Sequence, residues 1–161
     1  MVSKGVNSLN GIFTGNIAKT NYNRFLVYAN NQSNVTGDNT QYTIAFANTV
    51  VDSGSRWSTD TYTIPVGSGG TWLFIGQIAL QSTTVGTTYA IYLKKNATLY
   101  TLLEAGNLYV SPTELNYAAG ISLSVSAGDT IKLLLQVFGS SKDTSIVGGA
   151  QETSFGGVQL G

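Results

Sequence analysis

Short apolar and polar runs alternate along most of the chain, and they predict β-strands. The clearest run covers residues 121–126, where Ile, Leu and Val alternate with serines, as in a strand with one buried face. Residues 71–80 are apolar on both faces, which is typical of a central strand between packed layers. The remaining predicted strands cover residues 24–29, 42–47, 61–65, 88–93, 98–103, 130–138 and 154–160.

Turn-forming residues separate these strands. Residues 30–40 form a polar loop rich in Asn, Gly and Asp, and residues 52–55 and 127–129 form tight turns. A weakly patterned connection runs through Pro112 and Asn116. No window of ten residues has the spacing of an amphipathic helix. About 8–10 short strands joined by turns predict an all-β protein, an antiparallel sandwich or jelly roll.

Aromatic and small residues recur at characteristic spacings in the middle of the predicted sandwich. These positions are Phe46, Asp52, Trp57, Ile64, Gly70, Trp72 and Phe74. Their spacing resembles the signature of complement C1q globular-head domains, with the resemblance covering roughly residues 24–161. The 127–129 turn before an apolar strand, and Phe155-Gly156-Gly157 in the last strand, resemble two further features of that family.

Three positions depart from this signature. Ile64 stands where the family has Phe, Trp72 where it has Tyr, and Gly76 where an aromatic residue is usual. The Gly76 departure indicates a distant relative with a rearranged core. The resemblance implies a jelly roll of the C1q and tumour necrosis factor type, usually a homotrimer around a three-fold axis. It also implies that the two termini lie together at one end of that trimer.

Composition narrows the function classes. Charged residues make up 10% of the 161 residues, and the formal net charge is zero, which argues against a nucleic-acid partner. A surface so poor in charge is weakly protected against association, so we expect much of it to be buried in an assembly. The N-terminal residues lack the apolar run of a signal peptide, and no stretch is long enough to span a membrane. We therefore expect synthesis in a cytoplasm without Sec-type export, and no membrane partner.

The chain contains no Cys and no His, so it offers no thiolate nucleophile, imidazole base or zinc ligand set. Its eight acidic residues are scattered singly, and we interpret Asp52 as a turn residue, not half of a catalytic pair with Asp60. The protein is therefore predicted not to be an enzyme and to need no cofactor. A calcium site with oxygen ligands, at Asp38-Asn39 or Asp52, is the open alternative.

Residues 1–21 differ from the rest of the chain, because their apolar residues follow neither the strand nor the helix period. We interpret them as an N-terminal arm and residues 22–161 as the C1q/TNF-like jelly-roll domain. The arm is predicted to contact a partner or another subunit through Val6, Leu9, Ile12 and Phe13. Tyr109 and Tyr117 lie in the weakly patterned connection and are the tyrosines predicted for a ligand or partner surface. Tyrosines within strands usually pack in the core instead.

Two functions fit these features. The first is a trimeric virion structural protein, such as a capsid decoration, head-fibre or fibre-tip protein of a bacteriophage, anchored by its N-terminal arm to a capsid or other virion protein. Such a protein would be made in the host cytoplasm and reside in the virion. The alternative is a receptor- or glycan-binding module, either a tail-fibre tip or a secreted, extracellular C1q-like protein. The first is favoured by the missing signal peptide, the neutral composition and the arm.

Overall fold

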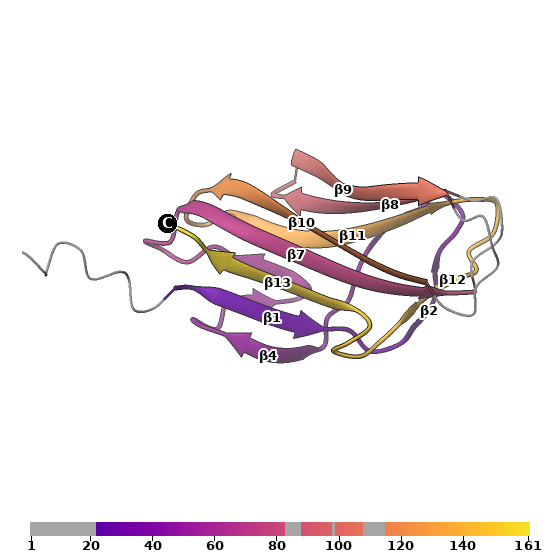
Figure 1. Ribbon diagram of the computed structural model, residues 1–161, viewed down its shortest axis with the longest axis horizontal. Coiled ribbons are helices and arrows are strands. Elements are labelled where there is room, and N and C mark those ends of the chain that lie inside the picture. Colours follow the sequence, from indigo (N-terminus) through magenta and orange to yellow (C-terminus); the bar gives the residue numbers. More distant parts are fainter. Residues whose placement is uncertain (1–21, 83–87, 98, 108–114) are drawn as a thin grey trace, which may run out of the picture.

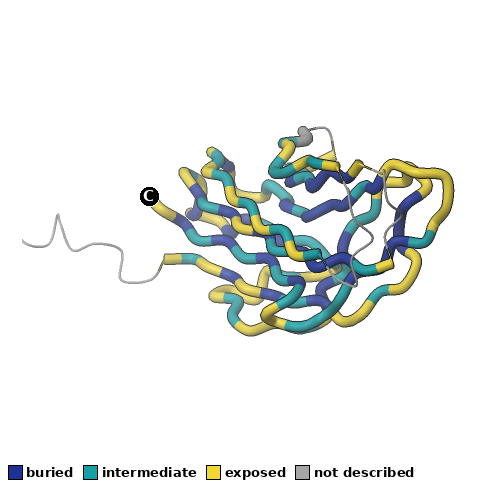
Figure 2. The backbone as a smooth tube through the Cα atoms, turned by 45° about the vertical axis from the view of Figure 1, so that its right-hand side comes forward, coloured by how far each residue is buried: buried dark blue, intermediate teal, exposed yellow. Residues whose placement is uncertain are grey.

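The computed structural model describes residues 22–82, 88–97, 99–107 and 115–161, and these form two stacked antiparallel sheets (Figure 1). The described residues contain no helix, as the sequence predicts, and hence none that could cross a membrane. Bulky side chains alternate between the interior and the surface along the strands, which Figure 2 shows as alternating buried and more exposed segments. The expected all-β jelly-roll sandwich is confirmed.

The larger sheet has seven strands. Along one path they are β2 (Gln32–Thr36), β12 (Thr144–Val147), β7 (Gly70–Gln81), β13 (Ser154–Gln159), β1 (Arg24–Tyr28) and β4 (Asn48–Asp52), with β10 (Leu115–Val125) also paired to β7. All of its pairings are antiparallel. β10 runs beside β7 from Leu115 opposite Leu80 to Val125 opposite Gly70, so it forms an edge of this sheet.

The smaller sheet has six strands. Along one path they are β5 (Trp57–Ser58), β6 (Thr61–Thr63), β11 (Thr130–Phe138), β8 (Thr88–Lys95) and β9 (Leu99–Asn107), with β3 (Gln41–Thr43) also paired to β11. The register of β9 against β8 shifts at Ile91, where a bulge interrupts the ladder. Among the described residues β9 pairs only with β8, so it forms an edge of the smaller sheet there.

The structure corrects the predicted polar loop at residues 30–40, since β2 lies within it. Side-chain hydrogen bonds help to hold this polar strand in place, among them two of Thr36, whose hydroxyl donates to the Thr40 carbonyl at 2.6 Å and accepts from the Val137 amide at 3.2 Å. Hydrogen bonds of polar side chains do not require alternating apolar residues, so the sequence pattern did not predict this strand. β12 was not predicted either, because three of its four residues are buried and it shows no alternation.

The predicted strand over residues 42–47 is also only partly right. β3 ends at Thr43, and the chain then turns away to form β4. The Ile44 amide still donates to the Leu133 carbonyl of β11 at 3.1 Å, whereas the Phe46 amide donates to the Asp60 carboxylate at 2.8 Å, so the chain has left β11 by Phe46. The predicted irregular connection through Asn116 is wrong at its C-terminal end, since β10 already begins at Leu115.

Aromatic rings dominate the core between the sheets. Phe25 stacks on Tyr62 with ring centroids 4.1 Å apart, and Phe155 contacts Phe25 edge-on at 5.1 Å. Trp72 and Phe74 are fully buried and stack on each other at 5.9 Å. Of the aromatic residues in the C1q-like spacing, Phe46, Trp72 and Phe74 are core residues and Trp57 packs against the core partly buried, which agrees with the sequence interpretation.

Both predicted aspartate turns are present. The Asp52 carboxylate accepts from the Trp57 amide at 2.8 Å and closes the turn after β4. The Asp129 carboxylate accepts from the Ser126 amide at 2.8 Å and forms a 2.8 Å ion pair with Lys95. Burial raises the pKa of Asp129, but the stronger combined effect of its hydrogen bonds and of the Lys95 charge lowers it to about 2. Asp129 is thus ionised at neutral pH and its charge is already neutralised.

Gly76 faces the interior of the sandwich, at the position where the C1q-like spacing predicts an aromatic residue. A Cβ atom at Gly76 would lie 2.9 Å from Cδ2 of Leu133, which reaches across from β11. Leu133 is fully buried, so its side chain occupies the space that a ring on β7 would need. The departure at Gly76 therefore has a local compensation in the opposite sheet.

Replacing Gly76 by phenylalanine is expected to destabilise the fold by about 1–3 kcal/mol, because the ring would overpack the core against Leu133. Adding Leu133→Ala removes the colliding methyl groups. The loss of unfolding free energy in the double variant should then be smaller, by at least about 1 kcal/mol, than the sum of the losses in the two single variants. Equilibrium denaturation of the four proteins measures this coupling, and strictly additive effects would contradict the compensation.

Candidate self-association surface

The outward side of the larger sheet is apolar, whereas an exposed sheet face is ordinarily polar. We call the outward positions of its central strands the apolar face. Its apolar and small residues are Leu26, Val51, Leu73, Ile75, Ala118, Gly120, Ser122, Ser154, Gly156 and Val158, and the polar residues Arg24 and Gln77 lie at outward positions beside them. The face exists because β1 and β7 carry bulky residues on both sides, and because β10 and β13 carry small residues on their outer side.

The strand register aligns these side chains in rows across the sheet. In the central row, Val51 is opposite Leu26, Leu26 is opposite Gly156, and Gly156 is opposite Ile75. A Cβ atom at Gly156 would lie 3.4 Å from Cδ1 of Leu26, so the glycine leaves a hollow beside the two projecting aliphatic side chains. A groove of about 420 Å³ follows these strands. The surface is therefore shaped to receive projecting side chains.

Charge is nearly absent from this groove. Of the residues that line it, Arg24 is the one with a charged side chain. Ile75 is 51% exposed and Leu26 is 38% exposed, so the apolar side chains are open to water in the isolated chain. A contiguous exposed apolar area on a rigid sheet marks an interaction site in most folded proteins. We therefore take the apolar face as the candidate functional site.

A second incompletely covered region lies where the two sheets meet at one edge. We call it the open flank, formed by the edge strands β9 and β10, which approach each other there. The inward residues Leu115, Tyr117, Ile121 and Leu123 of β10 pack against the core but remain partly exposed. Long edge strands without charge are normally covered or blocked, because their free backbone groups can pair with another chain. β10 spans 11 residues and contains no charged side chain.

Comparison with known proteins identifies the fold. The chain superposes on the globular domain of zebrafish complement 1qA with a TM-score of 0.60 and 16% sequence identity, over 86% of this chain and 98% of that one. Murine APRIL at pH 8.0 gives a TM-score of 0.61 and 15% identity, over 87% and 100%. Eiger TNF from S. frugiperda gives 0.59 and 12%, over 87% and 93%. The chain has the C1q/TNF jelly-roll fold.

These likenesses extend over almost all of the domain but rest on low sequence identity. No protein-family model matches the sequence, and no curated protein matches it. The C1q/TNF-like fold predicted from the aromatic spacing is thus confirmed at the level of structure. A phage or viral origin stays a prediction.

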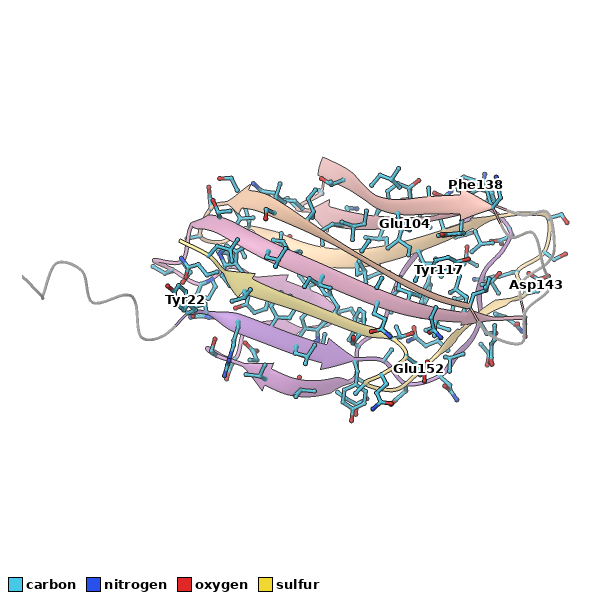
Figure 3. All side chains as sticks on the ribbon, viewed as in Figure 1. Tyr22, Glu104, Tyr117, Phe138, Asp143 and Glu152 are labelled. Atoms are coloured by element: carbon cyan, nitrogen blue, oxygen red, sulfur yellow. The ribbon has the colours of Figure 1, made fainter. Side chains whose placement is uncertain are left out.

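Tyr117 lies in a different setting from the one predicted. It belongs to β10 and its ring packs on Tyr89 with centroids 4.0 Å apart, beside Glu104, which accepts a 3.4 Å hydrogen bond from the Tyr89 hydroxyl (Figure 3). Burial raises the pKa of both phenols above the ordinary value for tyrosine. Tyr117 is accordingly part of the open flank, and its role in ligand or partner contact stays a prediction.

The other predicted contact residues, Tyr109 and the arm residues Val6, Leu9, Ile12 and Phe13, lie outside the described residues. The described residues bring together no group of three or more acidic, His or Cys side chains that could hold a metal ion. This absence tests neither the prediction of no cofactor nor the prediction of no enzymatic activity, so both remain predictions.

Sequence reasoning did not identify the apolar face. Residues 71–80 were interpreted as a central strand because they are apolar on both sides, and that strand, β7, is indeed central. The same apolar pattern on both sides of residues 71–80 also contained the signal for an apolar outer surface, which was missed. In the part of the chain that the structure describes, the larger sheet packs against one other layer, so the second apolar side of β7, with Leu73 and Ile75, faces outward.

Proposed function

We propose that the protein is a homotrimeric virion structural protein, of the capsid decoration, head-fibre or fibre-tip kind. The observation that carries the proposal is the apolar face, whose groove holds a single charged side chain. Burying such a face in an assembly removes apolar area from water, which contributes about 25 cal/mol per Å². A stable contact of ordinary size buries about 800 Å² on each partner.

The second surface of the contact is the open flank of a neighbouring copy. Each copy then contributes two different surfaces, the apolar face of the larger sheet and the partly exposed inward residues of β10. A contact between unlike surfaces repeats from copy to copy and closes into a ring when the rotation allows. Three copies are expected from the resemblance to C1q and TNF domains.

The position of the termini supports attachment through one end of the assembly. The Gln159 amide donates to the Asn23 carbonyl at 2.9 Å, and the Thr71 amide donates to the Gly161 carbonyl at 3.0 Å. The start of the domain and its C-terminus therefore lie at the same end (Figure 1). Residues 1–21 connect to the domain at this end, and in a ring about a common axis three such segments would start together. Three linked contacts raise the effective affinity for a capsid.

Removing residues 1–21 is expected to abolish binding to virions and to leave the trimer intact. The full chain and the truncated chain would each be mixed with particles purified from the source of the gene and sedimented, and the bound fraction compared. Light scattering would confirm the mass of both forms. Sedimentation of both forms to the same extent would reject the arm as the anchor. Failure of the full chain to bind any particle would reject the virion role.

A further inference from the structure

Glu104 is the charged residue of the open flank. Among the described residues of β9 and β10 it is the one with a charged side chain. Glu104 is opposite the buried Ile91, so its side chain lies on the inward side of β9, at the mouth of the gap between the sheets. A neighbouring copy that covers the open flank removes this carboxylate from water. A buried carboxylate is strongly destabilising unless hydrogen-bond donors compensate for the lost water.

The carboxylate of Glu104 has room for further donors. Within the described part of the chain it accepts one hydrogen bond, from the Tyr89 hydroxyl at 3.4 Å, and Tyr89 in turn packs on Tyr117 (Figure 3). An ionised carboxylate offers about four lone-pair sites. The long bond from Tyr89 therefore satisfies a small part of this capacity. In a contact that excludes water, the other donors come from the copy that covers the flank.

The apolar face carries two uncharged donors side by side, at its end remote from the termini. Ser154 of β13 and Gln77 of β7 are directly opposite each other and line the groove. The Ser154 hydroxyl makes no hydrogen bond to another described residue. The Gln77 amide donates one N–H to the Gln151 carbonyl and has a second N–H to offer. We call Ser154 and Gln77 the donor pair.

The donor pair lies at the level of Glu104 along the strands. Gln77 is opposite Ala118 of β10, which follows Tyr117, and Tyr117 packs on the tyrosine that donates to Glu104. Both termini lie at one end of the long domain (Figure 1). A three-fold axis along this direction keeps each residue at the same level in every copy. Glu104 of one copy then reaches the apolar face of the next at the donor pair.

Arg24, the charged residue of the groove, lies at a different level. Across the larger sheet it aligns with Ser122 of β10, which is five residues from Tyr117. Five strand residues span about 16 Å, which is longer than an arginine and a glutamate side chain laid end to end. Opposite charge therefore does not make Arg24 the partner of Glu104. Arg24 lies near the terminal end of the face, where its guanidinium can stay in water.

We propose that Glu104 of one copy binds the donor pair of the next, and that this contact sets the position of the open flank along the apolar face. Apolar contact is non-directional, so by itself it would let the flank slide along the groove. A buried carboxylate favours one position, because beside Leu73 or Ile75 it would find no donor. Polar groups in this role determine specificity more than affinity. The inference rests on the proposed self-association and names the residues that make it specific.

The first test is cross-linking, for which the chain is well suited because it contains no cysteine. The full-length Ser154→Cys, Glu104→Cys double variant would be treated with a short bismaleimide and run on a denaturing gel. We expect covalent trimers, since each copy is linked to two neighbours. Each single variant has one thiol per chain and can give no more than covalent dimers. The Arg24→Cys, Glu104→Cys double variant is the matched control and should give no covalent trimer.

The second test exchanges the polar groups. Ser154→Asp sets a carboxylate against Glu104, and Glu104→Lys sets an ammonium against the donors, so each variant should weaken self-association at least tenfold. The Ser154→Asp, Glu104→Lys double variant creates an ion pair and should return to within about threefold of the wild type. Light scattering over a range of concentrations measures these changes. Ser141→Asp, in the loop between β11 and β12, is the control and should keep the wild-type mass.

The outcomes separate this inference from the proposed function. A wild-type chain that stays monomeric at all concentrations would reject the self-association itself. A trimeric wild type whose Ser154→Cys, Glu104→Cys variant gives no covalent trimer, or whose Arg24→Cys control cross-links as well, would overturn the proposed contact alone. Double exchange that fails to restore association in folded protein, as judged by circular dichroism, would overturn it too.

Discussion

Replacing Ile75 by arginine is expected to convert the proposed trimer into monomers of 17.0 kDa that keep the native fold. Ile75 is 51% exposed at the centre of the apolar face, between Gly156 and Gly120 in the strand register, so the isolated domain can accommodate a longer side chain there. In the assembly the same arginine would be buried without a partner. An unpaired buried charge costs about 3–5 kcal/mol, which weakens each contact by a factor of about 100 or more.

Light scattering coupled to gel filtration measures the mass, and circular dichroism measures the retained strand content. Val66→Arg is the matched control, because Val66 is 90% exposed in the loop before β7 and lies off the apolar face. This variant should keep the mass of the wild type. A wild-type chain that is monomeric at high concentration, or an Ile75→Arg variant with unchanged mass, would contradict the proposed interface.

Replacing Phe155 by alanine is expected to lower the free energy of unfolding by about 3–5 kcal/mol, the range for truncating a large buried aromatic side chain. Phe155 is fully buried and contacts Phe25 at 5.1 Å, Phe46 at 6.0 Å and Trp57 at 6.1 Å between ring centroids. It thus joins rings from β1, β5 and the segment before β4 to the last strand. The surrounding rings are stiff and held by the two sheets, so the cavity can close only partly.

Denaturant unfolding followed by tryptophan fluorescence measures this effect at one fixed protein concentration, because the stability of an assembly depends on concentration. Phe138→Ala is the matched control. Phe138 is 37% exposed at the end of β11, so the same truncation should cost about 1 kcal/mol or less. Equal losses in the two variants would show that the central ring cluster does not dominate stability.

The C1q-like aromatic spacing was readable in the sequence because core rings must recur wherever successive strands cross the same interior. Phe46, Trp72 and Phe74 are all buried, as that spacing requires. Elements held mainly by tertiary hydrogen bonds were not readable. β2 is polar and is stabilised through the Thr36 hydroxyl, whose partners Thr40 and Val137 lie 4 and 101 residues away.

At the candidate sites, too, the sequence predicted some features and only the structure showed others. Gly76 was recognised as a departure from the aromatic pattern, but only the structure shows that Leu133 fills its place from the other sheet. Tyr117 was assigned to an irregular connection because the small residues Ala118 and Gly120 obscure the alternation of β10. Its packing on Tyr89 depends on the meeting of two sheet edges, which local sequence does not encode.

By itself the sequence determined the strand-rich composition, the absence of histidine and cysteine, and the ring spacing typical of a C1q/TNF-like jelly roll. These properties are local or compositional, so they can be recognised in the sequence without knowledge of three-dimensional contacts. Only the tertiary structure decided which side of each apolar strand faces outward. Strand register joined Leu26, Gly156 and Ile75 into an apolar face, and it placed Ser154 opposite Gln77 on the same face. Surfaces of this kind arise from residues distant in sequence, because pairing between strands brings them together.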